Sequence, residues 1–335
     1  MNQELTVPPP ADFKDRKAGL IIFGILTMCA GGLCAILVMV MFLAQSLPKQ
    51  ANVPQNPQAI IFATVMYGGM ALVLGVLGIG SILARRWARA LLLIFSWGWL
   101  LVGLFSVVGT LMLISSPSFI ASMQAARPAG QPALPVDTMK IFAFVSLGIS
   151  GIFFLLLPGV WIFFYGSRHV KATCEARNPS PCWTDRCPLP VLAMSICLAF
   201  CVPMMLAFPL LYRGVLPFFG VLISGTAGSI ACIILALFWG YSAWALYTLR
   251  LHGWWMVFLS MSLFSISSII TYSRHDIMET YRLMGYPEDQ IALLQRNNFF
   301  QGDRMLWMML FSALPWLLYL LWVRKFFGKK TAAVA

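Results

Sequence analysis

Three cysteines lie within fourteen residues in the stretch CEARNPSPCWTDRC, residues 174–187. Together with His169, which stands about one helical turn before the first of them, they offer four ligands that zinc or copper accepts. Cys174, Cys182 and Cys187 follow a C-x7-C-x4-C spacing, whereas structural zinc sites usually contain a C-x2–4-C pair. A redox-sensing thiol and an ordinary linker are the alternatives. The spacing favours a linker whose three thiols are exposed and far apart.

A second sulfur pattern lies on one face of an apolar segment. Met194, Cys197, Cys201 and Met205 recur at i, i+3, i+7 and i+11, which places them on one side of a helix. Thioethers and thiolates select Cu(I), but Met and Cys are also ordinary packing residues in apolar helices. The packing alternative is favoured. No cofactor is therefore predicted, and zinc or copper remains the minor alternative.

The most polar stretch of the chain predicts two short helices on a membrane surface. In SRHDIMETYRLMGYPEDQIALLQRNN, Gly285 is placed to end one helix and Pro287 to open another. His275 and Glu279 stand at i and i+4, a spacing that suits either a metal or a solvated pair, and the solvated pair is favoured. Six side chains are expected to form a lid or a docking face for a partner: His275, Glu279, Tyr281, Arg282, Glu288 and Asp289.

The composition places these segments in a membrane protein. Sixty per cent of the 335 residues are apolar and ten per cent are charged, whereas a soluble domain carries roughly 25% charged residues. A chain this apolar lacks the polar surface that a globule needs in water, so a lipid bilayer is its expected environment. The net charge of +12 is explained by basic residues at the ends of spanning helices rather than by nucleic-acid binding.

Eight apolar runs free of Asp, Glu, Lys and Arg are long enough to span a bilayer, which takes about 20 residues. Backbone groups in lipid must be bonded internally, and no run alternates with the period of a barrel strand. The predicted fold is therefore an all-α, polytopic membrane protein. The runs lie near residues 18–46, 58–84, 90–114, 141–166, 188–212, 215–249, 253–272 and 305–323.

The basic residues predict the orientation in the membrane. With both termini inside, fifteen of the 23 Lys and Arg fall on the cytoplasmic side and eight on the other. This asymmetry favours cytoplasmic termini and a cytoplasmic cysteine loop. We expect a multi-pass protein of the cell membrane, and the lack of an N-x-S/T acceptor agrees with a bacterial origin.

Two segments before predicted spans resemble each other and suggest an internal repeat. Asp15 and Arg16 in FKDR precede the first span, and Asp185 and Arg186 in WTDR precede the fifth, at an offset of 170 residues. The prediction is two four-helix units in the same orientation. The alternative is that aromatic and basic caps recur in any polytopic protein.

The repeat predicts how the chain is organised, with a proline in the fourth helix (Pro158) over one in the eighth (Pro315). The expected segments are a cytoplasmic tail (1–17), a four-helix unit (18–166), a cysteine-containing linker (167–187), a second four-helix unit (188–325) with an outer hairpin (273–303), and a second tail (326–335).

The middle of the spans holds no Asp, Glu, Lys, Arg or His. Ion-coupled carriers, proton relays and voltage sensors generally need such a group at depth. Clusters of small residues such as SGTAGS (224–229) favour tight helix packing over a local break that exposes backbone to a ligand.

The favoured function is consequently a non-enzymatic scaffold, sensor or accessory subunit that contacts other membrane-protein subunits. The alternative is a transporter of a neutral or apolar solute, or of a lipid, along the interface of the two repeats. An enzyme acting at the membrane surface through His169, Asp185 and the cysteines is the third hypothesis.

Overall fold

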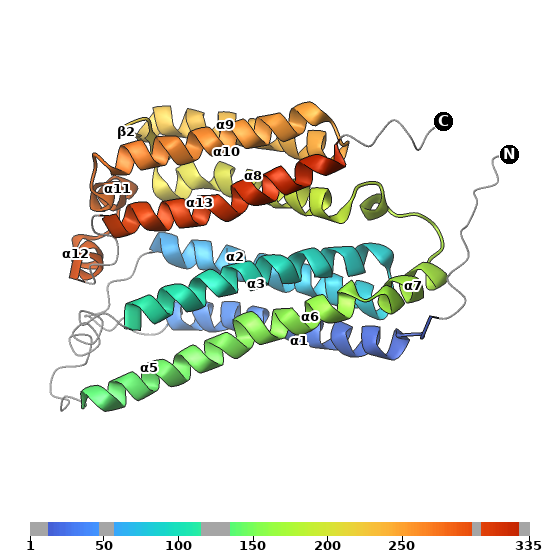
Figure 1. The fold of residues 1–335 in the computed structure, drawn as a ribbon. Helices are drawn as coiled ribbons and strands as arrows, with labels where there is room; N and C mark the ends of the chain where they lie inside the picture. The colour runs from blue at the N-terminus through green and yellow to red at the C-terminus, as the bar shows by residue number, and fades with distance from the viewer. Residues whose placement is uncertain (1–12, 47–56, 115–134, 297–302, 328–335) are drawn as a thin grey trace. The chain divides into compact units, whose positions relative to one another are not determined.

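The computed structural model describes residues 13–46, 57–114, 135–296 and 303–327. Nearly all of them are helical, and eight helices are long and apolar enough to cross a membrane (Figure 1). The predicted polytopic, all-α membrane fold is therefore confirmed. The described residues divide into two compact units, with unit 1 ending at Arg186 and unit 2 beginning at Cys187.

Unit 1 contains four of the candidate spans, and the fourth is built from three consecutive helical pieces. Within the unit α1 packs along α2, α2 against α3, and α3 against α6. Its elements are α1 (Lys17–Ser46), α2 (Pro57–Ile82), α3 (Arg86–Ile114), α5 (Val136–Gly151), a π-helical turn (Ile152–Leu156), α6 (Leu157–Gly166), α7 (Arg168–Arg177) and a 3₁₀ turn (Trp183–Asp185).

Unit 2 contains the other four candidate spans, and here too consecutive helices pack together: α8 with α9, α9 with α10, and α10 with α13. Its elements are α8 (Leu189–Tyr212), β1 (Leu216–Phe218), β2 (Val221–Ile223), α9 (Gly225–Tyr247), α10 (Leu251–Tyr272), α11 (Ile277–Met284), α12 (Glu288–Arg296), α13 (Asp303–Val323) and a 3₁₀ turn (Arg324–Phe326).

The π-helical turn in the fourth span has a local cause. Pro158 has no backbone N–H, so it cannot bond to the carbonyl four residues earlier, that of Phe154. Gly103 of α3 packs directly against this carbonyl, and a side chain at position 103 would overlap the carbonyl oxygen. The proline therefore opens the helix where a glycine on the neighbouring helix can fill the gap.

Small residues set the crossing of the first two helices in each unit. In unit 1 a Cβ on Gly24 would lie 2.9 Å from the carbonyl oxygen of Gly78, and one on Gly78 would lie 2.8 Å from that of Gly24. In unit 2 the Ser195 hydroxyl donates to the Ala243 carbonyl over 2.7 Å. Close backbone approach of this kind gains dispersion energy and hydrogen bonds where lipid gives no hydrophobic drive.

The sixth span begins ten residues later than the apolar run predicts. Residues 215–223 form an antiparallel hairpin in which Leu216 pairs with Ile223, so α9 starts only at Gly225. The hairpin turn holds Phe219 and Gly220 at positive φ, as a two-residue hairpin turn requires. SGTAGS is therefore the start of α9 rather than the middle of a span, and its Gly228 lies against the Gly214 carbonyl, where a Cβ would not fit.

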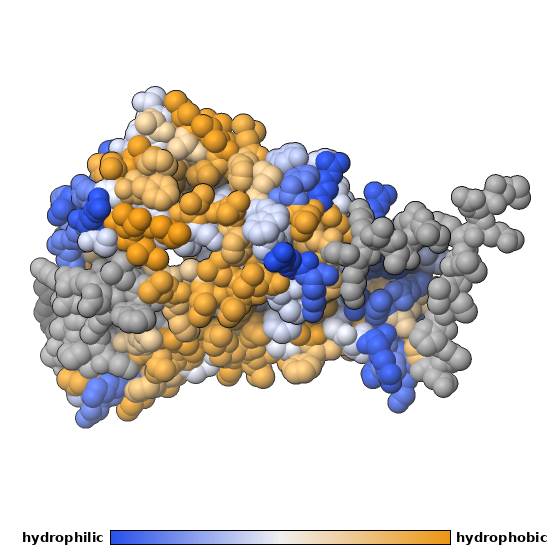
Figure 2. All heavy atoms as spheres, turned by 45° about the horizontal axis from the view of Figure 1, so that its top comes forward, coloured by the Kyte–Doolittle hydropathy of each residue, from blue (hydrophilic) through white to orange (hydrophobic). Residues whose placement is uncertain are grey.

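The flanks of the helices present apolar side chains outward. Leu72 of α2 is 73% exposed, Phe163 of α6 is 85% exposed and Leu210 of α8 is 84% exposed. In Figure 2 apolar residues cover the sides of the helices and hydrophilic residues gather at their ends. This distribution fits a lipid environment along the flanks and water or headgroups at the helix ends.

Candidate functional site

The segment before α1 is held against α7 by backbone hydrogen bonds. The amide of Arg16 donates to the Thr173 hydroxyl over 3.0 Å, and this hydroxyl donates to the His169 carbonyl over 2.8 Å. The amide of Lys14 donates to Nδ1 of His169 over 3.4 Å. The Ser167 hydroxyl accepts from the His169 amide and caps α7. The structure thus uses His169 as a structural acceptor at the end of unit 1.

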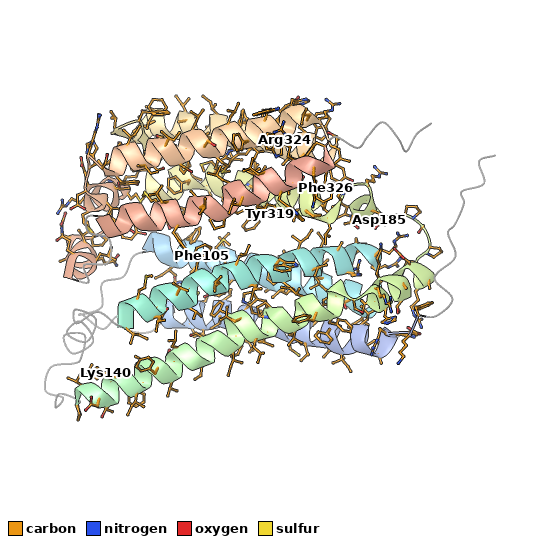
Figure 3. All side chains as sticks on the ribbon, in the orientation of Figure 1. Phe105, Lys140, Asp185, Tyr319, Arg324 and Phe326 are labelled. Atoms are coloured by element: carbon orange, nitrogen blue, oxygen red, sulfur yellow. The ribbon has the colours of Figure 1, made fainter. Side chains whose placement is uncertain are left out.

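Ion pairs reinforce the same end of unit 1. An Arg177 nitrogen lies 2.8 Å from an Asp15 oxygen. The Arg86 guanidinium lies 3.1 Å from Asp185 and 3.7 Å from Glu175. We call these five side chains the junction clasp. Figure 3 shows Asp185 at this end of the unit and Lys140 at the opposite end.

The two Asp-Arg motifs play different local roles. Asp15 bonds to Arg177, and this bond lowers the pKa of the Asp15 carboxyl. Asp185 accepts from the Cys182 amide over 2.9 Å and so caps its own 3₁₀ turn while also binding Arg86. Arg16 and Arg186 are both exposed. The two Asp-Arg motifs are therefore similar in sequence but make different contacts.

The expectation of exposed thiols in the cysteine loop is wrong for two of the three. Cys174 is 1% exposed and Cys187 is 5% exposed, while Cys182 is half-buried. Cys174 is buried because α7 packs against α1, α3 and α6 instead of projecting into solvent, and a thiol packs as a small apolar group. Cys187 is buried at the start of unit 2, two residues before α8. Burial raises the pKa of both Cys174 and Cys187 to about 11.

The predicted metal ligands are not brought together. In the described residues no group of three His, Cys, Asp or Glu side chains is placed to share a metal ion. At neutral pH the buried thiols of Cys174 and Cys187 are protonated because burial disfavours the charged form. A metal site or a redox thiol in the loop stays a prediction, and the positions of the described side chains give it no support.

The sulfur residues of the predicted copper stripe lie on α8. Met194 is buried, whereas Cys197 and Cys201 are half-buried one turn apart. Their helix contains Pro203 and Pro209, which have no backbone N–H to donate. These surroundings are apolar packing, which is the alternative that the sequence favours.

The polar stretch of unit 2 folds as two short helices, as predicted. Asp276 caps the start of α11 by accepting from the Met278 amide. Gly285 ends α11 with a φ of +87°, a conformation that favours glycine, and α12 begins at Glu288. We call residues 213–223 and 273–296 the cap of unit 2.

His275 ties the two parts of the cap together. Its Nδ1 lies 2.8 Å from a Glu279 oxygen and its Nε2 lies 3.1 Å from the Gly220 carbonyl of the hairpin turn. Both neighbours are acceptors, so both hydrogen bonds exist together only when both ring nitrogens carry a proton. The hydrogen bond with Glu279 raises the pKa of His275. Both hydrogen bonds are therefore present when the ring is protonated, and one of them is lost as pH rises through that raised pKa.

Other polar groups hold the hairpin to α10. The Phe219 amide donates to the Ser267 hydroxyl over 2.8 Å, and the Gly220 amide donates to the Thr271 hydroxyl over 2.9 Å. Ser267 also donates to the Pro217 carbonyl. The hairpin is not predicted from the apolar run, although Pro217 and the neighbouring glycines within an overlong run are a signal for a turn.

Tyrosines fill the space between the hairpin base and α11. The Tyr281 and Tyr286 rings are edge to face with centroids 5.1 Å apart, and the Tyr212 ring is parallel to that of Tyr286 at 6.4 Å. Burial raises the pKa of Tyr286 to about 12. The guanidinium of Arg213 lies over Gly285, where a Cβ would be only 3.0 Å from it. The cap is thus cross-braced from α8 as well as from α10.

The exposed side of the cap is charged. The side chains of Glu279, Arg282 and Glu288 are 49%, 51% and 72% exposed, and Arg282 lies 3.3 Å from Glu288 and links α11 to α12. Of the predicted docking residues, Glu279, Arg282 and Glu288 are therefore exposed, whereas Tyr281 packs against Tyr286. Asp289 belongs to α12, but its side chain lies outside the described part of the structure.

Comparison with known proteins adds no relative to this description. No protein-family model matches the chain, and no curated protein or solved structure is significantly similar to it.

Proposed function

We propose that this chain is a non-enzymatic membrane scaffold or accessory subunit whose cap on unit 2 binds a partner protein. The observation that carries the proposal is the construction of the cap. His275 bonds the hairpin turn to α11, Ser267 bonds the hairpin to α10, and the Tyr212 ring at the end of α8 lies parallel to that of Tyr286. A loop that merely connects spans does not need internal hydrogen bonds together with contacts from two spans.

The chemistry of the cap surface favours a protein partner. At the hairpin tip Phe218 is 57% exposed and Phe219 is 45% exposed. The tip adjoins the charged face because His275 bonds both Gly220 and Glu279. Aromatic anchors bordered by charged groups of both signs are the usual composition of a protein interface.

A catalytic alternative lacks its usual groups. The middle of the spans carries no Asp, Glu, Lys, Arg or His in the sequence, and acids, bases or metal ligands of these types are what membrane-embedded hydrolysis and proton transfer generally require. Of the groups that a surface enzyme would use, His169, Asp185 and Cys174 are engaged in capping or packing at the end of unit 1, and Cys187 is buried at the start of unit 2. These contacts support the non-enzymatic function.

The test is site-specific crosslinking in cells. A photoreactive residue at Phe219 should yield one defined crosslinked protein, identified by mass spectrometry, that copurifies in stoichiometric amount after mild solubilisation. Exchanging the charges, as Glu279→Arg with Arg282→Glu, should lower its recovery at least about fivefold, because rim charges set specificity while the net charge is unchanged. The matched control exchanges exposed Asp137 and Lys140 at the start of α5 and should leave recovery unchanged.

Two outcomes would reject this function. Equal recovery in both charge-exchange variants would show that the cap is not the docking surface. Flux of a neutral solute through vesicles containing only the purified chain would favour the transport alternative, whose path would run between the two repeats.

We infer that the two units are copies of one four-helix unit. The supporting observation is a pair of small residues that flank the turn between the second and third spans of each unit. Gly80 meets Ala88 in unit 1, and Ala245 meets Gly253 in unit 2, both at an offset of 165 residues. A Cβ on either glycine would lie 2.6–2.7 Å from the alanine Cβ. The same contact is therefore made with the glycine on opposite sides.

A further inference from the structure

Three cations gather at the end of unit 2 that lies opposite the cap. Arg250 stands between α9 and α10, while Arg324 and Lys325 follow α13 directly. All three are exposed. The α9–α10 turn and the end of α13 lie together, because the Trp254 indole nitrogen donates to the Leu320 carbonyl over 2.8 Å. Figure 3 shows Arg324 and Phe326 at this end of α13.

Each of these cations lies over aromatic rings. The Arg250 guanidinium carbon is 4.4 Å from the centre of the Trp244 ring. That of Arg324 is 5.3 Å from the Trp254 ring. The Lys325 ammonium is 4.4 Å from the Trp322 ring. A ring face attracts a cation but does not neutralise it, so the full positive charge remains.

Carboxylates are far, in sequence and in structure, from Arg250, Arg324 and Lys325, which we call the basic rim. Every Asp and Glu after residue 186 lies within 276–303, and the ion pairs described in unit 2, His275–Glu279 and Arg282–Glu288, belong to the cap. The 22 residues of α10 separate the cap from Arg250, which is about 33 Å of helix. The charge of the rim therefore has no counter-charge from the described part of its own unit.

The rings place the rim at the depth of lipid headgroups. Trp244, Trp255 and Trp322 are each 41–46% exposed, and all three lie at ends of helices that are candidate spans. Partly exposed tryptophans at span ends sit at the level of the headgroups, where their apolar bodies face the chains. An arginine at this depth presents a planar set of donors that fits the two free oxygens of a phosphodiester.

The geometry points to a binding site for anionic phospholipid headgroups formed by Arg250, Arg324 and Lys325. The phosphodiester would bond to the arginine donors while the tryptophans contact the glycerol and upper acyl chain. The charge complementarity decides for an anionic lipid, because a zwitterionic headgroup brings its own cation and would leave the charge of the rim uncompensated.

The experiment measures lipid binding to the purified full-length chain by native mass spectrometry. The chain is titrated with phosphatidylglycerol and, separately, with phosphatidylcholine in the same mixed micelles. We expect retention of phosphatidylglycerol in clear preference to phosphatidylcholine. The triple variant Arg250→Gln, Arg324→Gln, Lys325→Gln should lose about tenfold or more of the affinity for phosphatidylglycerol. Equal affinity of the native chain for the two lipids would overturn the proposal.

A matched control removes three exposed cations from the end of unit 1, as Lys14→Gln, Lys17→Gln and Arg168→Gln. It loses the same net charge as the triple variant, so both variants lose the same general attraction for anionic lipid. Its affinity for phosphatidylglycerol should stay within about twofold of the native chain, because Arg250, Arg324 and Lys325 are still present. Equal losses in the two variants would reject a defined site.

Two further measurements keep the result interpretable. The variant Arg250→Lys with Arg324→Lys keeps the charge and removes the planar donors, so it tests the site even if the triple variant fails to fold. It should bind phosphatidylglycerol more weakly than the native chain, and native affinity would contradict phosphate recognition by the arginines. Displacement of the lipid by millimolar inorganic phosphate would instead assign the site to a free anion.

Discussion

The turn between α2 and α3 and the turn between α9 and α10 have the same backbone conformation, but their side chains contact different groups. Ala84 and Leu249 have φ values of 53° and 56°, and each precedes an arginine that precedes the next helix. The hydrogen bonds coincide as well. Arg85 donates its amide to the Gly80 carbonyl and Arg250 to that of Ala245, both over 2.9 Å.

The side chains around these equal backbones differ in charge. In unit 1 the Arg85 side chain bonds to Asn178, and Arg86 pairs with Glu175 and Asp185. In unit 2 Arg250 lies on a tryptophan ring. The fourth helix of unit 1 is followed by a segment that contains Glu175 and Asp185, whereas the sequence after α13 has no acidic residue. One backbone design thus serves as a closed clasp in one unit and as an open basic rim in the other.

The largest effect is expected from the small-residue contact. In Gly80→Ala the new Cβ would lie 2.6 Å from the Ala88 Cβ, so stability in detergent should fall by about 2 kcal/mol, as for other overpacked contacts. Adding Ala88→Gly recreates the unit 2 arrangement and should restore at least half of the loss, as measured by thermal unfolding.

The control for this exchange is Gly98→Ala on α3, where a Cβ would meet nothing within 4 Å. It should be neutral or slightly stabilising, because alanine favours helix over glycine. A double variant no more stable than Gly80→Ala would argue against equivalent contacts in the two units.

A smaller difference is expected between the arginines of the two turns. Arg86→Gln leaves Asp185 without its cation and leaves Glu175 with Lys171 alone. The Arg86 side chain is only 18% exposed, so we expect a loss of about 1–1.5 kcal/mol. Arg250→Gln removes an exposed cation–π contact and should cost under about 1 kcal/mol. Thermal unfolding of both variants in the same neutral detergent makes the comparison, and equal losses would show that the clasp adds nothing beyond the rim.

The smallest effect concerns acid. The hydrogen bond from Arg177 lowers the pKa of Asp15 below its ordinary 3.8. This contact therefore contributes stability above that value, and the contribution is lost as pH falls through the lower folded pKa. Amide exchange at residues 17–20, corrected for intrinsic rates, should accelerate between about pH 5 and about pH 2.5.

The paired variant Asp15→Asn should remove most of this acid response. Residues 250–253 in the unit 2 turn should show none in the native chain, because their arginine has an aromatic partner that does not titrate. An equal acid response at residues 17–20 and at residues 250–253 would mean that the carboxylates of the junction clasp are not its source.

The sequence by itself determined the membrane class, the approximate spans and the two cap helices. Spans follow from long apolar runs because lipid forces each backbone to bond internally over about 20 residues. The cap helices follow from Gly285 and Pro287, whose effects on the backbone are local. The hairpin at 216–223 escaped because an apolar strand and an apolar helix look alike without periodicity.

Only the tertiary structure decided which polar groups meet. Asn178 donates to the Ala84 carbonyl across 94 positions of sequence, and Arg177 meets Asp15 across 162. The burial of Cys174 likewise depends on α7 folding back onto the unit, a choice made by helix packing rather than by the loop's composition. Such contacts are set by how whole helices approach one another, and the charge pattern along the chain does not record that approach.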